Sequence, residues 1–322
     1  MVCLSTGLKG DTMRRFLLFF ITLVIVLYLG LSWFFASIVI DYRPQEEARD
    51  AEWAAIYAPE WDVPVSETVE IISGNNTLIA DVYDNPADND CAVMIVHGLG
   101  GERALVRQYG TLFWELGCDV MSYDFAPRNN DVFLTYGYTE KDDLENVLTW
   151  FGEYTELPTS SIGIWAESYG AATALQMLPQ QSDVAWVIAD SSYASMSSIL
   201  NEQAIAQFGE GIRVMLPGAF FMIEQRADFT IDDVSPVDAI SDVTVPILLI
   251  HSQSDELINP ANSQAIYDAA NPVTTRLVFT DWGSAHTQSY YDDKAAYSAI
   301  IYEFLREFAP AFGNQSSIEQ GS

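Results

Sequence analysis

Basic residues are scarce in this chain. Its 322 residues include 14 Lys and Arg against 45 Asp and Glu, which gives a formal net charge of -31 at pH 7. Binding of nucleic acid requires clustered Lys and Arg that neutralise phosphates, and the sequence holds no such cluster. Nucleic acid is therefore not expected as a partner. The acidity predicts a heavily solvated surface, as in a protein that works in salty surroundings; attraction of cationic partners and solubility through self-repulsion are the alternatives.

Low-complexity segments and internal repeats are also lacking, which argues against a disordered chain and against a repeat architecture. Histidine and cysteine occur only three times each. Any chemistry that needs a histidine base therefore has few residues to use. With 49% hydrophobic and 13% aromatic residues, the chain can bury one large core or two small ones.

The most informative stretch is Ile162–Ala172, where an apolar run breaks at Ser168 and continues as a predicted helix. A sharp turn between strand and helix exposes the serine hydroxyl and needs small neighbours, here Ala166 and Gly170. This is the nucleophile-elbow pattern G-x-S-x-G, with Ala166 in place of the first glycine. Taken alone, the motif is also compatible with a serine in an ordinary strand-to-helix loop.

An uncharged, strongly apolar segment runs from Phe16 to Ile40, long enough as a helix to cross the roughly 30 Å hydrocarbon core of a bilayer. Basic residues precede it and acidic residues follow it, so the positive-inside rule places residues 1–15 in the cytoplasm and the chain after the apolar segment outside. These flanking charges are Lys9, Arg14 and Arg15 on one side and Asp41, Glu46, Glu47 and Asp50 on the other.

A cleaved signal peptide is the alternative to this transmembrane anchor. Its apolar region is typically about 7–15 residues long and ends at a small-x-small site, which is not evident near Ile38–Ile40. We therefore favour an uncleaved anchor. Residues 41–65 are interpreted as a juxtamembrane linker.

Strand and helix patterns alternate through the remaining chain. Period-two runs on either side of Gly74 predict an antiparallel hairpin at 68–72 and 78–83. Short apolar runs then alternate with helical patterns, which predicts a mostly parallel sheet covered by helices on both faces. The predicted strands are 92–96, 120–123, the run into Ser168, 184–189, 246–250 and 276–279; the predicted helices are 104–116, 142–154, 168–177, a helix after Pro260, and 293–308.

One segment, 193–234, contains no obvious strand but many apolar residues. It is inserted between two predicted strands. A packed helical decoration and a cap that closes over an apolar pocket are the two interpretations.

A glycine-rich turn, His97–Gly101, follows the first buried strand. Its glycines allow backbone N–H groups to face a ligand above the strand ends, where an oxyanion hole would be needed. The amides of Leu99 and of Tyr169, the residue after the predicted nucleophile, are the expected donors.

A serine nucleophile needs a base, and the choice is between His97, His251 and His286. His286 follows the last predicted strand, at the end of the sheet where Ser168 lies. His97 and His251 adjoin buried strands and are interpreted as structural, so we predict His286 as the base.

The acid that orients the base should follow the preceding strand, where Asp255 lies. Glu256 and Asp281 are alternatives. Asp190, after the strand that follows Ser168, is a further candidate.

These motifs together resemble the α/β-hydrolase superfamily over residues 66–310 and, within it, the membrane-anchored Bem46-type serine hydrolases. The order Ser168, Asp255, His286 matches the order of triad members in that fold. Further similarity lies in Val96-His97-Gly98, Tyr123-Asp124, the run 135–144 and His251-x-x-x-Asp255-x-x-x-x-Pro260; the departures are Ala166 and the run 125–130, where relatives usually carry Arg-Gly-x-Gly-x-Ser.

The resemblance implies an α/β-hydrolase domain at 66–312, with a cap at about 193–234 and a C-terminal tail at 313–322. It implies acyl transfer through a covalent serine ester, with no metal or cofactor. An apolar cap near a bilayer suits a small-molecule or lipid-like acyl ester. A thioesterase or serine aminopeptidase on the same triad, and an inactive membrane-tethered binding protein, are the alternatives.

Cys91 and Cys118 each lie six residues before a strand end, on strands that are parallel neighbours in the hydrolase sheet. An extracytoplasmic domain permits a disulfide, but neighbouring parallel strands were expected to strain it, so the sequence favours two buried thiols over a bond. Cys3 is expected to be free, with acylation as the alternative.

Overall fold

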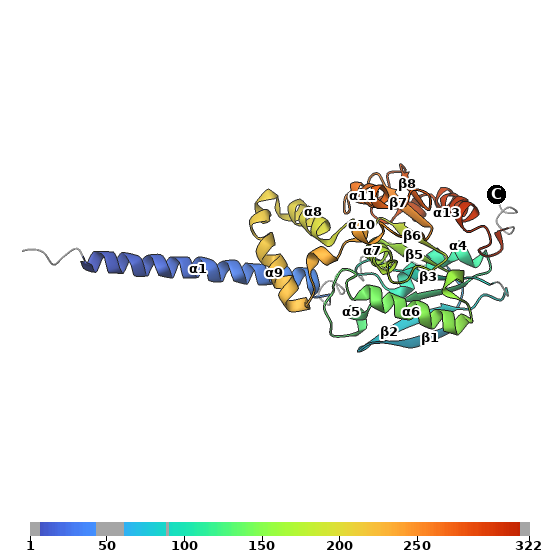
Figure 1. Ribbon diagram of the computed structural model, residues 1–322, viewed down its shortest axis with the longest axis horizontal. Helices are drawn as coiled ribbons and strands as arrows, with labels where there is room; N and C mark the ends of the chain where they lie inside the picture. The colour runs from blue at the N-terminus through green and yellow to red at the C-terminus, as the bar shows by residue number, and fades with distance from the viewer. Residues whose placement is uncertain (1–6, 43–60, 88–89, 316–322) are drawn as a thin grey trace, which may run out of the picture.

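The computed structural model describes residues 7–42, 61–87 and 90–315. A long helix, α1 (Gly7–Ile40), projects from a body in which helices cover both faces of one sheet (Figure 1). The expected linker is described only at 41–42 and 61–65, and residues 1–6 and 316–322 of the two expected tails lie outside the described residues. The strands are β1 (Glu67–Ser73), β2 (Asn76–Tyr83), β3 (Ala92–Val96), β4 (Asp119–Tyr123), β5 (Ile162–Glu167), β6 (Trp186–Asp190), β7 (Ile247–Ser252) and β8 (Thr275–Thr280).

Within the described residues these strands form one 8-stranded sheet in the order β1-β2-β4-β3-β5-β6-β7-β8. β1 pairs with β2, and β2 with β4, in antiparallel orientation, whereas the ladders from β4 through β3 to β8 are parallel. Gly74 supplies the positive φ of 58° in the β1–β2 turn. The mostly parallel sheet predicted from the alternating pattern is confirmed.

The central strands are apolar throughout because both of their faces are buried. Along β5, Ile164 lies in one core with α6 and α7, and its neighbour Trp165 lies in the other core with α4 and α13. The α-helices of the body are α3 (Arg103–Val106), α4 (Thr111–Trp114), α5 (Ala126–Asn129), α6 (Glu140–Thr155), α7 (Ser168–Met177), α8 (Met196–Phe208), α9 (Leu216–Ala227), α10 (Pro236–Ala239), α11 (Ala261–Ala269), α12 (Ser289–Asp292) and α13 (Lys294–Phe308).

The predicted helix at 104–116 is divided into α3, a 3-10 turn (Arg107–Gly110) and α4. The division brings Gly110 against the Trp61 ring, where a Cβ would lie 2.8 Å from the nearest ring atom. Tight packing of this aromatic side chain therefore accompanies the break.

The inserted segment is helical, as the sequence indicated. Between β6 and β7 it forms α8, a 3-10 turn η3 (Glu210–Val214), α9 and a second 3-10 turn (Ile231–Asp233). The Oγ of Ser195 caps α8 by accepting a hydrogen bond from the Ser198 amide. We refer to α8, η3 and α9 together as the cap.

Helix α1 is long enough and apolar enough to cross a membrane from Thr12 to Ile40, with a mean hydropathy of 2.5 over its most apolar window. It is the one such helix within the part of the chain that the structure describes. Its length and composition are compatible with the predicted anchor.

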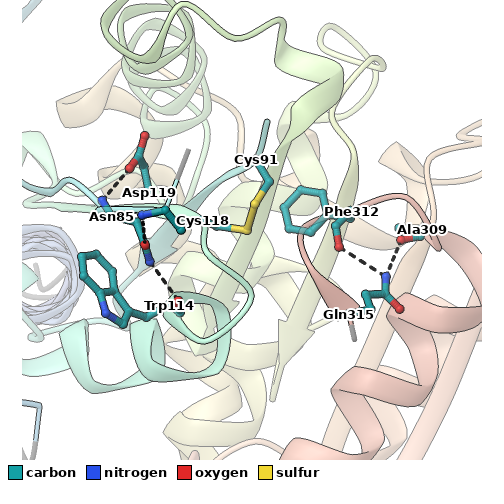
Figure 2. The surroundings of a disulfide bond; sticks show 9 residues. Asn85, Cys91, Trp114, Cys118, Asp119, Ala309, Phe312 and Gln315 are labelled. Atoms are coloured by element: carbon teal, nitrogen blue, oxygen red, sulfur yellow. Dashed lines mark hydrogen bonds between the residues drawn. A yellow bond between two sulfur atoms is a disulfide. The ribbon is translucent and has the colours of Figure 1, made fainter. Parts of the chain in front are cut away.

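The cysteine prediction is corrected by the structure, in which Cys91 and Cys118 form a disulfide (Figure 2). Ala92 and Asp119 are the first pair of the β3–β4 ladder, so the two cysteines lie just before it. Their Cα atoms are 4.8 Å apart, within the usual range of about 4.4–6.8 Å for disulfides. The ladder therefore brings the two cysteines side by side. Because they lie outside it, the strand pairing does not restrict their side chains.

Replacing both of these cysteines by alanine is expected to lower the free energy of unfolding by about 3–4 kcal/mol, because the bond closes a loop of moderate length in the unfolded chain. The bonded residues are 27 positions apart. Thermal unfolding in detergent, with Cys3→Ser as the control, measures the effect. Unchanged unfolding, or alkylation of Cys91 and Cys118 without reductant, would contradict the bond.

Candidate active site

Ser168 lies at the junction of β5 and α7, in a left-handed backbone conformation with φ of 51°. Such a conformation is costly for a residue with a side chain, by roughly 1–3 kcal/mol, and persists where the surrounding structure imposes it. The contacts that impose this conformation are close: a Cβ at Gly170 would lie 2.5 Å from the His97 carbonyl oxygen. Ala166 fits in place of the usual glycine, fully buried within β5. The chain therefore forms the sharp turn that the sequence predicted.

Three loops at the carboxyl ends of parallel strands bring the predicted triad residues together. Ser168 follows β5, Asp255 follows β7 and His286 follows β8. His286 Nε2 lies 2.8 Å from Ser168 Oγ, and His286 Nδ1 lies 2.6 Å from Asp255 Oδ2. The contact with Asp255 fixes the proton on Nδ1, which leaves Nε2 able to accept the serine proton.

Asp255 is held as an anion. Its Oδ1 accepts hydrogen bonds of 2.9 Å from the amides of Leu257 and Ile258. Burial opposes ionisation, but the hydrogen bonds to His251 and His286 outweigh it and hold the pKa of this carboxyl well below its usual range. The side chain therefore stays ionised at neutral pH, as an acid that orients a histidine requires.

His251, for which we predicted only a structural role from the sequence, contacts the same carboxylate. Its Nε2 lies 3.2 Å from Asp255 Oδ2 and 2.9 Å from the Ile258 carbonyl, and its Nδ1 lies 2.7 Å from Ser263 Oγ. The spacing of four residues between His251 and Asp255 is the feature of the sequence that pointed to this contact. His251 thus braces the loop that carries the acid.

His97 is fully buried beneath the glycine turn, with Nδ1 2.7 Å from the Gly98 carbonyl oxygen. Burial lowers its pKa to about 4, against the opposing charge of Asp124. A neutral ring that shapes the turn is consistent with the structural role predicted for it.

The alternative acids lie elsewhere. Glu256 and Asp281 are exposed. Asp190 accepts a hydrogen bond of 2.7 Å from the Tyr297 hydroxyl and one of 2.8 Å from Ser191 Oγ. Burial raises the pKa of Asp190. The structure thus pairs His286 with Asp255.

The predicted oxyanion donors flank the serine. A Cβ built on Gly98 would lie 3.2 Å from Ser168 Cβ, so the turn that carries Leu99 packs directly against the elbow. Tyr169 is in the first turn of α7, where backbone N–H groups point out of the helix and favour negative charge. The predicted donors therefore belong to two segments that adjoin Ser168, the turn at 98–101 and the first turn of α7.

Glu167, a buried carboxyl next to Ser168, was not recognised in the sequence. Its Oε1 accepts a hydrogen bond of 3.3 Å from the Gly98 amide, and its Oε2 lies 3.4 Å from the Tyr109 hydroxyl, which is itself 3.3 Å from the Thr287 carbonyl. Burial, with a smaller contribution from the charge of Asp190, raises the pKa of Glu167 to about 8. A neutral Glu167 therefore connects the glycine turn at 98–101, through Tyr109, to the loop of the predicted base.

Glu167→Gln is expected to remove a pH dependence of stability. An unfolded Glu titrates near about 4.3, so between that pH and the folded pKa of about 8 only the folded state keeps the proton. Wild-type stability should fall as pH rises through this window and level off above it. The melting temperature of the variant relative to wild type should therefore increase from about pH 5 to about pH 8. A constant difference across this range would show that Glu167 is ionised in the folded protein.

A cavity of about 970 Å³ lies between α8 and the loop after Asp255. Its walls include Asp255 itself and the exposed side chain of Leu257. The cap thus borders one member of the predicted triad. Among the described residues, no group of three or more His, Cys, Asp or Glu side chains is arranged to hold a metal ion.

The chain is similar to known proteins. A family model described as the prolyl oligopeptidase family matches residues 128–310. The uncharacterized protein YqkD of Bacillus subtilis is 30% identical over 224 residues, which cover 68% of this chain and 72% of YqkD.

Solved structures share the fold at lower identity. A Pyrococcus furiosus esterase is 20% identical with a TM-score of 0.60, over 79% of this chain and 95% of its own. An acylaminoacyl peptidase of Pyrococcus horikoshii is 17% identical with a TM-score of 0.61, and the match covers 79% of this chain but 43% of the peptidase.

Proposed function

The chain belongs to the prolyl oligopeptidase family of α/β-hydrolases, and from that premise we propose that it cleaves ester-type acyl bonds through Ser168, His286 and Asp255. The two short contacts that join these side chains carry the proposal. The sequence order of the three residues is that of the α/β-hydrolase triad.

The proposed reaction has two steps. His286 Nε2 takes the proton of Ser168 as the hydroxyl oxygen attacks the acyl carbon, and Asp255 stabilises the imidazolium that results. The amides of Leu99 and Tyr169 donate to the oxyanion, and the protonated His286 then passes its proton to the leaving alkoxide. In the second step His286 activates a water that hydrolyses the serine ester and restores the hydroxyl.

An ester substrate is supported by the large apolar side chains that the cap exposes, such as Phe208 and Phe221, and by the predicted membrane anchor. The chain also matches nearly all of the esterase but less than half of the acylaminoacyl peptidase. Peptide cleavage remains the second candidate, because both the family name and that peptidase point to it.

A series of p-nitrophenyl esters of increasing acyl length, followed by matched thioesters and peptide anilides, tests the proposal. We expect kcat/KM for the best ester to exceed that for the matched anilide by several orders of magnitude, with a preference for hydrophobic acyl chains. Anilide turnover at the rate of the ester would favour the peptidase.

We further propose that α1 anchors the protein, with its N-terminus in the cytoplasm and the hydrolase domain, about 66–312, outside, as in a Bem46-type hydrolase. The basic residues before the apolar segment support this orientation. So does the disulfide between Cys91 and Cys118, because such bonds persist in oxidising compartments.

Protease added to intact cells or spheroplasts is expected to digest the hydrolase domain and to leave a small fragment that contains α1. An antibody against an N-terminal tag, which should stay protected, reports the other side. Digestion of the hydrolase domain only after lysis would reverse the orientation.

A further inference from the structure

The cap packs along the last third of α1, as Figure 1 shows for α9. The two helices approach closely at Gly218 in α9, where a Cβ would lie 2.2 Å from Ser32 Oγ and 2.8 Å from the Tyr28 ring. The Tyr28 hydroxyl also donates a hydrogen bond of 3.3 Å to the carbonyl oxygen of Val214. The absence of a side chain at Gly218 therefore lets the two helices meet.

At the far end of the contact, Arg226 joins α9 to the end of α1. It donates a hydrogen bond of 2.7 Å to Ser37 Oγ and forms an ion pair of 3.1 Å with Asp41. Its guanidinium lies 4.2 Å from the centre of the Trp33 ring. The contacts thus extend from Tyr28 to Asp41 and fix the cap on the helix.

The length of α1 then sets the level of the cap in a membrane. Side chains are exposed from Thr12 to Leu27, and the uncharged part of that stretch begins at Phe16. Phe16–Leu27 is about 18 Å long at 1.5 Å per residue, short of the roughly 30 Å of hydrocarbon that a spanning helix crosses. Residues from Tyr28 onward, on which the cap packs, must supply the remainder.

The cap exposes three large apolar side chains to solvent. Val214 in η3 is 72% exposed, and Phe221 in α9 is 54% exposed. Phe208 at the end of α8 is 48% exposed although its ring contacts Phe35 of α1, with centres 5.4 Å apart. Large exposed apolar side chains gathered beside a membrane helix mark a surface that contacts lipid.

We propose that the cap is embedded in the bilayer, at the boundary between headgroups and acyl chains on the side of the hydrolase domain. Val214, Phe221 and Phe208 contact the lipid there. The proposal rests on the proposed anchoring by α1. The exposed ion pair of Arg213 and Glu210 lies in η3, beside Tyr28, so these long side chains must extend from that level toward the headgroups.

This position gives the cap a function beyond packing. One side of it meets lipid, and α8 borders the cavity that contains Asp255. A lipid-like ester in the bilayer therefore lies next to the helices that border this cavity. The partner of the cap is thus the lipid surface itself.

The full chain, reconstituted in phosphatidylcholine nanodiscs, allows a direct test. In a Cys3→Ser background, which leaves the Cys91–Cys118 disulfide intact, a single cysteine replaces Val214 and carries the environment-sensitive fluorophore NBD. Val273→Cys is the matched control, because Val273 is another valine, 76% exposed, on the hydrolase body. Leu23→Cys, within α1, reports whether the helix spans the bilayer.

We expect the label at position 214 to emit at shorter wavelength and to lose emission to lipids that carry a nitroxide near the headgroup. The label at 273 should respond only to aqueous iodide, and the label at 23 should respond to a nitroxide deep in the acyl chain.

If 214 behaves like 273 while 23 is quenched by lipid, the helix spans but the cap lies in water, and the proposal is overturned. If 23 is not quenched by lipid, the span fails and the proposal fails with it. Ester turnover by each labelled variant tests the proposed enzymatic function separately.

Discussion

Ser168→Ala is expected to lower ester turnover by about 10⁴–10⁶-fold, because the substitution removes the atom that attacks the acyl carbon. His286→Ala should have an effect of similar size, since without Nε2 the hydroxyl keeps its proton at neutral pH. The measurement is kcat/KM on the best p-nitrophenyl ester, with circular dichroism to show that each variant is folded.

The double variant sharpens this prediction. Ser168 and His286 act in one step, so removal of the second group should cost little once the first is gone. Losses that multiply in the double variant would show that the two residues act independently. The 2.8 Å contact between them would then have no catalytic meaning.

Asp255→Asn should lower kcat by about 10³–10⁴-fold, because an amide favours the wrong tautomer of His286 and cannot balance the imidazolium charge. Asp190→Asn is the matched control, with the same substitution at a buried aspartate after a neighbouring strand. Burial raises the pKa of Asp190, and its carboxyl meets the Tyr297 and Ser191 hydroxyls, so an amide of the same shape should leave turnover near wild type.

The reverse result, a large loss at Asp190 with Asp255→Asn near wild type, would move the acid to the end of β6. Comparable losses at both positions would indicate that the two side chains support the site together. The pH profile separates these cases, because only the acid that faces His286 should shift the pH at which activity begins.

The fold could be predicted from the sequence because its strands are buried on both faces. Runs such as 92–96 and 246–250 are wholly apolar, and the helical patterns between them are long enough to be distinguished. The triad residues could be placed for a related reason: parallel strands end at one edge of the sheet, so the residues that follow them converge.

What the sequence did not predict depends on contacts between distant segments. The disulfide was missed because we expected neighbouring parallel strands to strain it, whereas Cys91 and Cys118 lie just before the β3–β4 ladder with their Cα atoms 4.8 Å apart. Glu167 resembles any acidic residue in a turn until its burial against Gly98 and Tyr109 is known.

The packing of the cap on α1 was equally hidden. From the apolar residues of 193–234 we considered a packed helical decoration and a cap over an apolar pocket, and neither interpretation included the attachment of α9 to the predicted anchor through Gly218 and Arg226. A glycine and an arginine in a helix give no sign of their partner when it lies almost two hundred residues away.

Labelling with a fluorophosphonate, which forms a covalent bond with activated serines, tests the central claim most directly. On folded protein near neutral pH, mass spectrometry of the digested adduct should place the label on Ser168, and His286→Ala should abolish labelling. An adduct on another serine, or none on folded wild-type protein, would contradict the account and would favour an inactive binding protein with the hydrolase fold.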